Sequence, residues 1–417
     1  MNIKIRLITM NFLQFFVWGA WLITIANYWF GTKDWSGENF GMIFMTLGIS
    51  SLFMPTLMGI VADRWLNAEK LFGILHILSG IFVASLPFAN TPTSFFWIML
   101  GAMIFYMPTI ALTNTISYNA LKQYNLDVVK NFPPIRVWGT IGFIAAMWVT
   151  NLTGNKATEF QFYISAFSAI ILGIYSFTLP KCPPQANNTA NSSFVEIFGL
   201  DAFKLFANYK MALFFIFSML LGAALQLTNM YGDVYLDDFK NIAEYADSFV
   251  VEYSTIIMSI SQISETLFIL AIPLFLKKFG IKKVMLISMF AWVLRFGLFS
   301  YGNPGNLLWM IILSNIIYGM AFDFFNISGS LFVETQVSSK IRASAQGLFM
   351  MMTNGFGAII GALGSGIIID NFFVNDGTKD WAGIWLTFSI YALIVTVLFA
   401  IFFKHKHNPN ELSEIKH

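Results

Sequence analysis

The chain has 417 residues, of which 57% are hydrophobic, 17% are aromatic and only 11% are charged, and its mean hydropathy is +0.67. A water-soluble domain cannot hide that much apolar surface, so the composition excludes a soluble protein and indicates one whose solvent is the bilayer. The single cysteine excludes an internal disulfide and a cysteine-rich metal site, and the net charge of +2 gives no reason to expect a nucleic-acid partner.

The first half of the chain contains six apolar segments, each long enough to cross a hydrocarbon core of about 30 Å. The first begins after Lys4 and Arg6, as a secretory signal would, but it runs past Trp21 without a small-residue cleavage site, so we interpret it as a span. Gln14, Trp18, Trp21 and Asn27 on this span are candidates for lining a polar cavity, although Trp is equally typical of helix packing and of interface belts. The six segments lie at roughly 7–30, 40–61, 71–88, 94–118, 133–150 and 160–180.

Six more apolar segments follow a polar stretch that is rich in Asn, Ser and Pro. They lie at roughly 211–236, 250–275, 284–301, 307–332, 345–369 and 382–403. The sequence therefore predicts an all-α membrane protein of twelve transmembrane helices in two pseudo-symmetric six-helix bundles. We expect an N-terminal bundle over 1–180, a cytoplasmic linker with an amphipathic surface helix over 181–210, a C-terminal bundle over 211–403 and a cytoplasmic tail over 404–417.

The basic residues predict the orientation. Most Lys and Arg side chains fall in the loops and termini on one side, which predicts that both termini are cytoplasmic. The opposite loops hold only Lys33, Lys156, Lys240 and Lys379. The segment from Gly232 to Glu252 is acidic, which suits an outer loop.

Two carboxylates stand near the middle of predicted spans. Glu265 lies about fifteen residues into the eighth span and Asp323 about sixteen into the tenth, so a rise of about 1.5 Å per residue puts both near the midplane. An ionisable group at that depth costs at least about 2.5–3.5 kcal/mol, so it normally faces a polar cavity or a partner. Both are candidate proton carriers, and the sequence does not rank them; a purely structural buried pair is the alternative.

Amides and aromatic rings surround these acids at helical spacing. Gln262 lies three residues before Glu265, and Gln226 and Asn229 repeat the spacing in the seventh span. Tyr318 and Phe322 bring aromatic surface to the level of Asp323. Amides beside acids and rings suit a flat heterocycle that carries a sugar. The alternative is that each amide only holds helices together, a contribution of about 0.6 kcal/mol.

Two arginines lie in or near spans. Pro133 and Pro134 suit the start of the fifth helix, which would leave Arg136 in its first turn, either at the cytoplasmic headgroups or facing a cavity with Thr140 and Phe143. For Arg295 in the ninth span we expect an acidic partner.

The second span closes on the pattern Gly59-x-x-x-Asp63-Arg64, a candidate gating turn that is equally typical of a solvated turn. No phosphate-binding loop or nucleophile elbow is present, and the four His do not cluster, so we expect no enzyme, metal or ATP-driven pump.

Several strings resemble the bacterial nucleoside:proton symporter family of the major facilitator superfamily. They are FPPIRVWGTIGF (132–143), GAALQLTN (222–229), SISQISETLFI (259–269), AFDFFNISGS (321–330) and RASAQG (342–347), and the resemblance covers nearly the whole chain. Ala224 departs from the pattern, because some relatives carry an acid there, and it leaves in doubt any coupling role assigned to that position.

The resemblance implies a carrier in the bacterial inner membrane that moves purine or pyrimidine nucleosides inward with protons, uses the proton gradient and no cofactor, and acts as a monomer. It also implies a central site formed by Arg136, Thr140, Phe143, Gln226, Asn229, Gln262, Glu265, Tyr318, Phe322 and Asp323. A sugar or glycoside:proton symporter is the alternative within transporters, and a membrane enzyme or a receptor without transport are the alternatives outside them.

Overall fold

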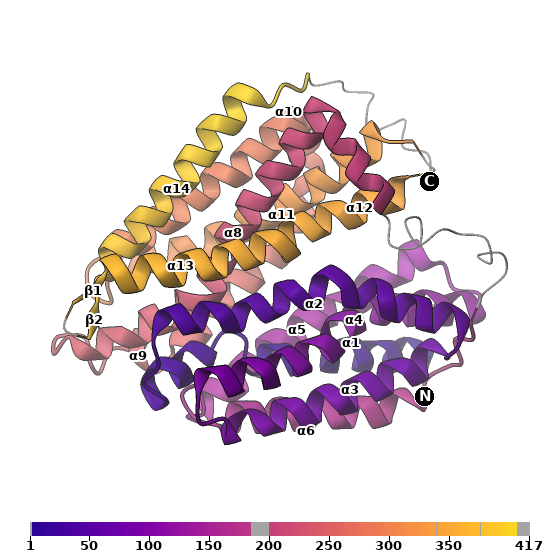
Figure 1. Cartoon of the computed structure of the whole chain (residues 1–417), viewed down its shortest axis with the longest axis horizontal. Helices are drawn as coiled ribbons and strands as arrows, with labels where there is room; N and C mark the ends of the chain where they lie inside the picture. The colour runs from indigo at the N-terminus through magenta and orange to yellow at the C-terminus, as the bar shows by residue number, and fades with distance from the viewer. Residues whose placement is uncertain (1, 185–199, 339–340, 376, 407–417) are drawn as a thin grey trace. The chain divides into compact units, whose positions relative to one another are not determined.

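The computed structural model describes residues 2–184, 200–338, 341–375 and 377–406. Within these ranges the chain is helical apart from one short hairpin, and it divides into two compact units (Figure 1). Unit 1 comprises Met1–Ala190 together with the segments Asn229–Val234 and Tyr253–Ile256. Unit 2 comprises Asn191–Thr228, Tyr235–Glu252 and Ile257–His417.

The helices of the first 180 residues run roughly parallel or antiparallel to one another (Figure 1). Helix α1 packs against α5, α3 packs against α4 and α6, and α2 packs against α4. The elements are α1 (Ile3–Gly19), the π-helix η1 (Asn27–Thr32), α2 (Gly37–Arg64), α3 (Ala68–Ser85), the 3-10 turn η2 (Leu86–Phe88), α4 (Pro92–Gln123), α5 (Val128–Leu152) and α6 (Phe160–Ser176).

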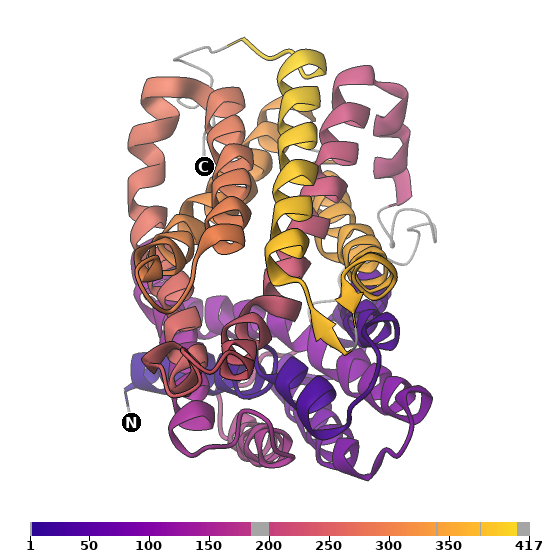
Figure 2. The ribbon, with the colours of Figure 1, turned by 90° about the vertical axis from the view of Figure 1, so that its left-hand side faces the viewer.

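The second half begins with the 3-10 helix η3 (Leu200–Ala207), which lies in the predicted linker, whereas residues 185–199 of that linker lie outside the described residues. The hairpin pairs β1 (Val374–Asn375) with β2 (Thr378–Lys379) next to α14 (Figure 2). The other elements are α8 (Tyr209–Asp238), η4 (Phe239–Asn241), α9 (Phe249–Glu252), α10 (Ser254–Tyr301), α11 (Leu308–Gln336), α12 (Arg342–Met350), the π-helix η5 (Met351–Gly357), α13 (Ala358–Phe372) and α14 (Trp381–Phe402).

These elements account for the twelve predicted spans. Nine of the described helices are long and apolar enough to cross a membrane, and α12, η5 and α13 together form one of them. Helix α10 supplies two spans because its path bends at Gly280, where φ is +73° and the helical geometry is interrupted. The shorter helices α1 and α6 take the first and sixth places.

Glycines bring one pair of helices into backbone contact in each unit. In unit 1 a Cβ on Gly142 of α5 would collide with the Phe12 carbonyl of α1. In unit 2 a Cβ on Gly222 of α8 would collide with the Thr353 carbonyl of η5. Without a hydrophobic driving force between helices in lipid, close approach over small residues is what binds such pairs. The first span is thus tied to the fifth, and the seventh to the eleventh, as expected for two similar halves.

The fifth helix begins earlier than the sequence predicts. The Asp127 side chain caps α5 by accepting a hydrogen bond of 3.1 Å from the Lys130 amide, so the helix starts at Val128. Pro133 and Pro134 then lie inside the helix, and Arg136 lies about two turns from its start, not in the first turn.

A buried polar network occupies the middle of the N-terminal helices. Gln14, fully buried, donates to the Thr109 hydroxyl at 2.8 Å and contacts His76 Nε2 through its Oε1 at 2.7 Å. The Tyr106 hydroxyl donates to the Gln14 carbonyl at 2.8 Å. Gln14 therefore serves helix packing, and the interpretation of this residue as cavity lining is wrong.

Candidate functional site

In unit 1 the predicted site residues lie on one stretch of α5 that faces α1. The Arg136 guanidinium carbon stands 4.1 Å from the centre of the Phe15 ring, a cation–π contact. The Phe143 ring meets Trp18 edge-on, with 6.4 Å between centroids and an angle of 84°. Arg136, Thr140 and Phe143 are each partly exposed, so they keep surface available for a ligand.

In unit 2 the site residues are carried by α10 and α11, which approach closely at Gly319. A Cβ at this position would lie 2.6 Å from the Glu265 amide nitrogen, so only glycine allows the contact. One turn away, the Ser261 hydroxyl donates to Asn315 Oδ1 at 2.9 Å. This close packing brings Glu265 of α10 to the part of α11 that carries Tyr318 and Asp323.

The two predicted proton carriers lie within electrostatic range of each other. Asp323 is 4% exposed, and the charge of Glu265 acts on it. Glu265 is partly exposed. Both carboxylates also act on the Tyr318 hydroxyl, so the three groups form one cluster in unit 2. When two carboxylates lie this close, their negative charges repel each other. Binding of one proton by the pair removes that repulsion.

Among the buried side-chain atoms of unit 2 that have no hydrogen-bond partner within the described residues, three are acceptors on predicted site residues. They are Gln226 Oε1 on α8, Gln262 Oε1 on α10 and Asp323 Oδ2 on α11. A buried acceptor without a donor is unfavourable by about 1–3 kcal/mol, and such groups are rare in native proteins. All three belong to residues that the sequence predicts as substrate ligands, although Asn229, three residues from Gln226, belongs to unit 1.

The two aromatic rings of the cluster, Tyr318 and Phe322, are stacked. The Tyr318 and Phe322 rings lie one helical turn apart and nearly parallel, with 5.9 Å between centroids and 7° between planes. Tyr318 is buried and Phe322 is partly exposed. Phe322 therefore offers a ring edge or face to a ligand, with Tyr318 behind it.

The predicted gating residues lie at the end of α2. Helix α2 continues through Arg64, so Gly59 and Asp63 belong to its last turns and the turn itself follows at Trp65. Asp63 is exposed, and a Cβ on Gly59 would meet nothing within 4 Å.

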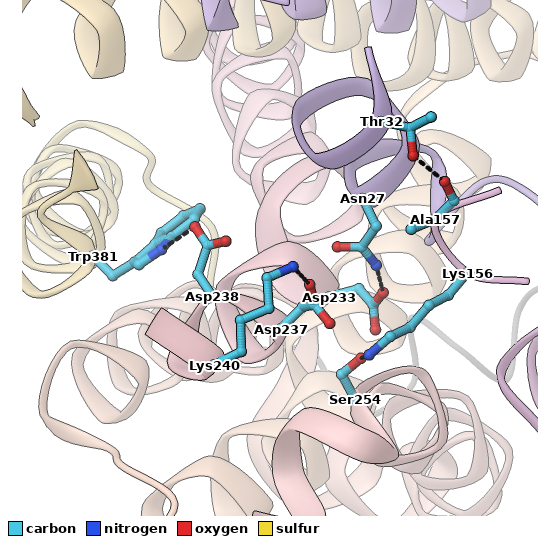
Figure 3. Close-up of polar contacts among 10 residues, drawn as sticks. All are labelled: Asn27, Thr32, Lys156, Ala157, Asp233, Asp237, Asp238, Lys240, Ser254 and Trp381. Atoms are coloured by element: carbon cyan, nitrogen blue, oxygen red, sulfur yellow. Dashed lines mark hydrogen bonds and ion pairs between the residues drawn. The ribbon is translucent and has the colours of Figure 1, made fainter. Parts of the chain in front are cut away.

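Asp233 is a buried acid on α8 that the sequence did not mark as a candidate, because it falls both at the end of the predicted span 211–236 and at the start of the acidic segment from Gly232. Helix α8 extends to Asp238, and Asp233 is 1% exposed. Its Oδ2 accepts a hydrogen bond from Asn27 Nδ2 (Figure 3). The signal that it belongs to the helix is its spacing, four residues after Asn229. Asp233 is therefore a further acid on a membrane helix, beside Glu265 and Asp323.

Two further contacts surround the Asn27–Asp233 pair in unit 1. The Lys156 ammonium donates to the Ser254 hydroxyl at 3.0 Å, and the Thr32 hydroxyl donates to the Ala157 carbonyl (Figure 3). In unit 2, the Trp381 indole donates to Asp238 Oδ2 at 2.9 Å. Asp237 forms an ion pair with Lys240. Three acids of this segment, Asp233, Asp237 and Asp238, thus form hydrogen bonds or an ion pair within the fold.

Arg295 of α10 has no acidic partner among the described residues, so the expectation of an ion pair is wrong. Its guanidinium is fully buried and contacts a carbonyl, a hydroxyl and aromatic rings instead. The described residues also contain no group of three or more His, Cys, Asp or Glu side chains arranged to hold a metal ion.

Comparison with protein families matches residues 1–408 to the model described as "Nucleoside H+ symporter". Among curated proteins, the chain is 50% identical to the xanthosine permease of Escherichia coli over 413 residues, 99% of this chain and 98% of that protein. It is also 50% identical to the nucleoside permease NupG of the same species over 410 residues, 98% of this chain and 97% of that protein.

Solved structures agree with these relatives. The crystal structure of the nucleoside transporter NupG superposes with a TM-score of 0.91 at 50% identity, covering 97% of this chain and all of that one. The crystal structure of a D-xylose-proton symporter superposes with a TM-score of 0.71 at 14% identity over 96% of this chain and 98% of that one. The latter likeness shows the fold alone, which is that of the major facilitator superfamily.

Proposed function

The chain belongs to the nucleoside H+ symporter family, and from this premise we propose that it takes up nucleosides with protons by alternating access, with ligand residues on α5 in unit 1 and on α8, α10 and α11 in unit 2. The observation that carries the site is the set of three buried acceptors without donors, Gln226 Oε1, Gln262 Oε1 and Asp323 Oδ2. A nucleoside has donors that match them, on the ribose hydroxyls and on the base N–H groups.

The other site residues have complementary tasks. Phe322, supported by Tyr318, packs on the flat face of the base. Arg136 and Thr140 on α5 supply donors to acceptor atoms of the base or ribose, and Phe143 adds apolar contact. A sugar would satisfy the same acceptors and would also pack on an aromatic ring, so the family match and the 50% identity to nucleoside permeases are what favour a nucleoside over the sugar alternative.

Proton coupling is assigned to the Glu265–Asp323 pair. A buried carboxylate is costly while it is charged and unpaired, and binding a proton removes that cost. One proton taken up by the pair lets the loaded site occlude, and its release on the other side resets the carrier. Direction follows the proton gradient across a bacterial inner membrane, with both chain termini on the cytoplasmic side.

The decisive experiment is uptake of radiolabelled nucleosides into proteoliposomes with an imposed pH gradient. We expect accumulation of at least one purine or pyrimidine nucleoside, its collapse on adding a protonophore, and competition by unlabelled nucleosides but not by xylose or maltose. Accumulation that ignores the protonophore would contradict symport, and competition by sugars alone would favour the sugar carrier.

The site itself is tested by Gln226→Ala and Gln262→Ala. Each variant loses one acceptor for a substrate donor, so each should weaken nucleoside binding by about 0.5–1.5 kcal/mol. Gln123→Ala is the matched control, because Gln123 is an exposed amide that donates to the Lys181 carbonyl at the end of α4. Variants of both site amides that bind nucleoside like the control would remove Gln226 and Gln262 from the site.

A further inference from the structure

Arg295 is a fully buried charge to which symport assigns no task. It lies in the second part of α10, its side chain is 0% exposed, and no described carboxylate pairs with it. Placing a charged side chain in a membrane span costs free energy, and such side chains normally have a function.

Arg295 ties α10 to α11 through a reciprocal pair of hydrogen bonds with one residue. Its Nη1 donates to the Ser314 carbonyl at 2.7 Å, and the Ser314 hydroxyl donates back to the Arg295 carbonyl at 2.9 Å. Its Nε reaches the Thr228 hydroxyl of α8 at 3.4 Å. Thr228 immediately precedes Asn229, a proposed ligand. From the second part of α10, this one side chain therefore contacts α8, which carries Gln226, and α11, which carries Asp323.

The guanidinium also holds the aromatic pair in place. Its carbon stands 4.7 Å from the centre of the Tyr318 ring, and Trp292 of the same helix meets that ring edge-on at 5.9 Å and 86°. Tyr318 in turn lies parallel to Phe322. The orientation of Phe322 thus depends on a ring that a buried cation and an indole hold from α10.

We propose that Arg295 is a positioning residue for substrate recognition, which fixes the Tyr318–Phe322 pair at the angle needed to pack on the nucleobase. This inference rests on the proposed nucleoside function. A planar guanidinium suits the task better than an ammonium, because it combines a contact with a ring face and fixed donor directions toward the Ser314 carbonyl and the Thr228 hydroxyl. Arg295 Nη2 is a buried donor that has no hydrogen-bond partner among the described residues.

The inference predicts a particular kinetic pattern. Arg295→Gln should raise the KM for nucleoside by about 2- to 30-fold, the range that corresponds to loss of one buried cation–π contact. The maximal rate and the dependence on the proton gradient should be kept, because the Glu265–Asp323 pair is intact. Arg295→Lys should share the defect, since an ammonium lacks the planar fork. Ser314→Ala is the matched control: it removes the hydroxyl but keeps the carbonyl that Arg295 uses, so its KM should stay near that of the wild type.

The closing experiment is a double-mutant cycle on purified protein in proteoliposomes, with Arg295→Gln, Tyr318→Leu and the pair. If Arg295 acts through Tyr318, Arg295→Gln raises KM in the wild type but adds nothing in the Tyr318→Leu background. Equal KM increases in both backgrounds overturn the inference, and so does an unchanged KM in Arg295→Gln. Where the Gln variant does not fold, Arg295→Lys takes its place, and a wild-type KM in that variant overturns the inference equally. Wild-type protein that transports no nucleoside would refute the proposed function first, and the inference with it.

Discussion

At the residue scale, the proposed proton coupling rests on the two acids that the sequence places at mid-depth and the structure places in one cluster. Glu265 and Asp323 act on each other electrostatically across the α10–α11 contact, and Asp323 is almost completely buried. Their spacing in the sequence predicts only depth. Their proximity requires Gly319, which lets the two helices approach.

Substitutions that keep the shape of each acidic side chain can distinguish proton coupling from nucleoside binding. Asp323→Asn and Glu265→Gln retain size and some hydrogen bonding but cannot titrate, so at least one should keep nucleoside exchange while losing accumulation driven by a pH gradient. Counterflow and gradient-driven uptake in the same proteoliposomes measure the two properties. If both single variants and the double variant still concentrate nucleoside, neither acid carries the proton.

Cys182, just after α6, is a second residue whose chemistry the fold changes. It is 5% exposed, and its amide donates to Glu69 Oε2 at 2.8 Å. Burial, with smaller effects from the charges of Glu69 and Asp63, raises the pKa of the Cys182 thiol to about 11. The thiol therefore stays protonated at neutral pH and is a poor nucleophile.

We expect maleimide to modify Cys182 slowly at pH 7 in folded protein, and faster as the pH rises toward the thiol pKa or when detergent unfolds the chain. A Cys182→Ala, Gln123→Cys variant provides the comparison, because position 123 is exposed. Mass spectrometry of the labelled protein measures the rates. Equal rates for the two cysteines at neutral pH would contradict a buried thiol.

At the scale of the element, the helices are set by local signals and by glycine contacts. Asp127 starts α5 ahead of its two prolines, and Gly280 divides α10 into two spans. Apolar length alone separates the two spans of α10 on either side of Gly280, but it misses the start of α5, because a hydropathy window does not register a side-chain cap.

Substitution of Gly142 should separate α1 from α5. An added methyl meets the Phe12 carbonyl, and overpacking of this kind typically destabilises by about 1–3 kcal/mol. Gly142→Ala should therefore lower the thermal unfolding temperature in detergent. Gly364→Ala on α13 is the control, since nothing lies within 4 Å of its Cβ, and it should be neutral or slightly stabilising. A Gly142→Ala protein as stable as the control would show that the helices have room to separate.

At the scale of the whole molecule, the asymmetry of basic residues predicts that both termini are cytoplasmic. A reporter that is active only in the cytoplasm should work when it is fused after His417, and one that is active only in the periplasm should not. The opposite result would reverse the orientation of every span. Internal fusions near Lys156 and Lys379, in predicted outer loops, should give the reciprocal pattern and control for expression.

The sequence alone determined the class, the twelve spans, the family and the residue types of the candidate site. These follow from properties that accumulate along a chain: apolar length, loop charge and short strings at helical spacing. Residues three or four apart share a face of a helix, so Gln262 with Glu265 and Tyr318 with Phe322 are predictable pairs.

Only the tertiary structure decided which groups on different helices meet. It removed Gln14 from the cavity by pairing it with His76 and Thr109, placed Asp233 in a buried contact with Asn27, and gave Arg295 aromatic and backbone partners in place of an acid. Helical periodicity gives the direction of a side chain on its own helix but not the neighbour that it faces. That neighbour depends on which helices pack together and at what rotation, and here glycines such as Gly319 and Gly142 decide the approach.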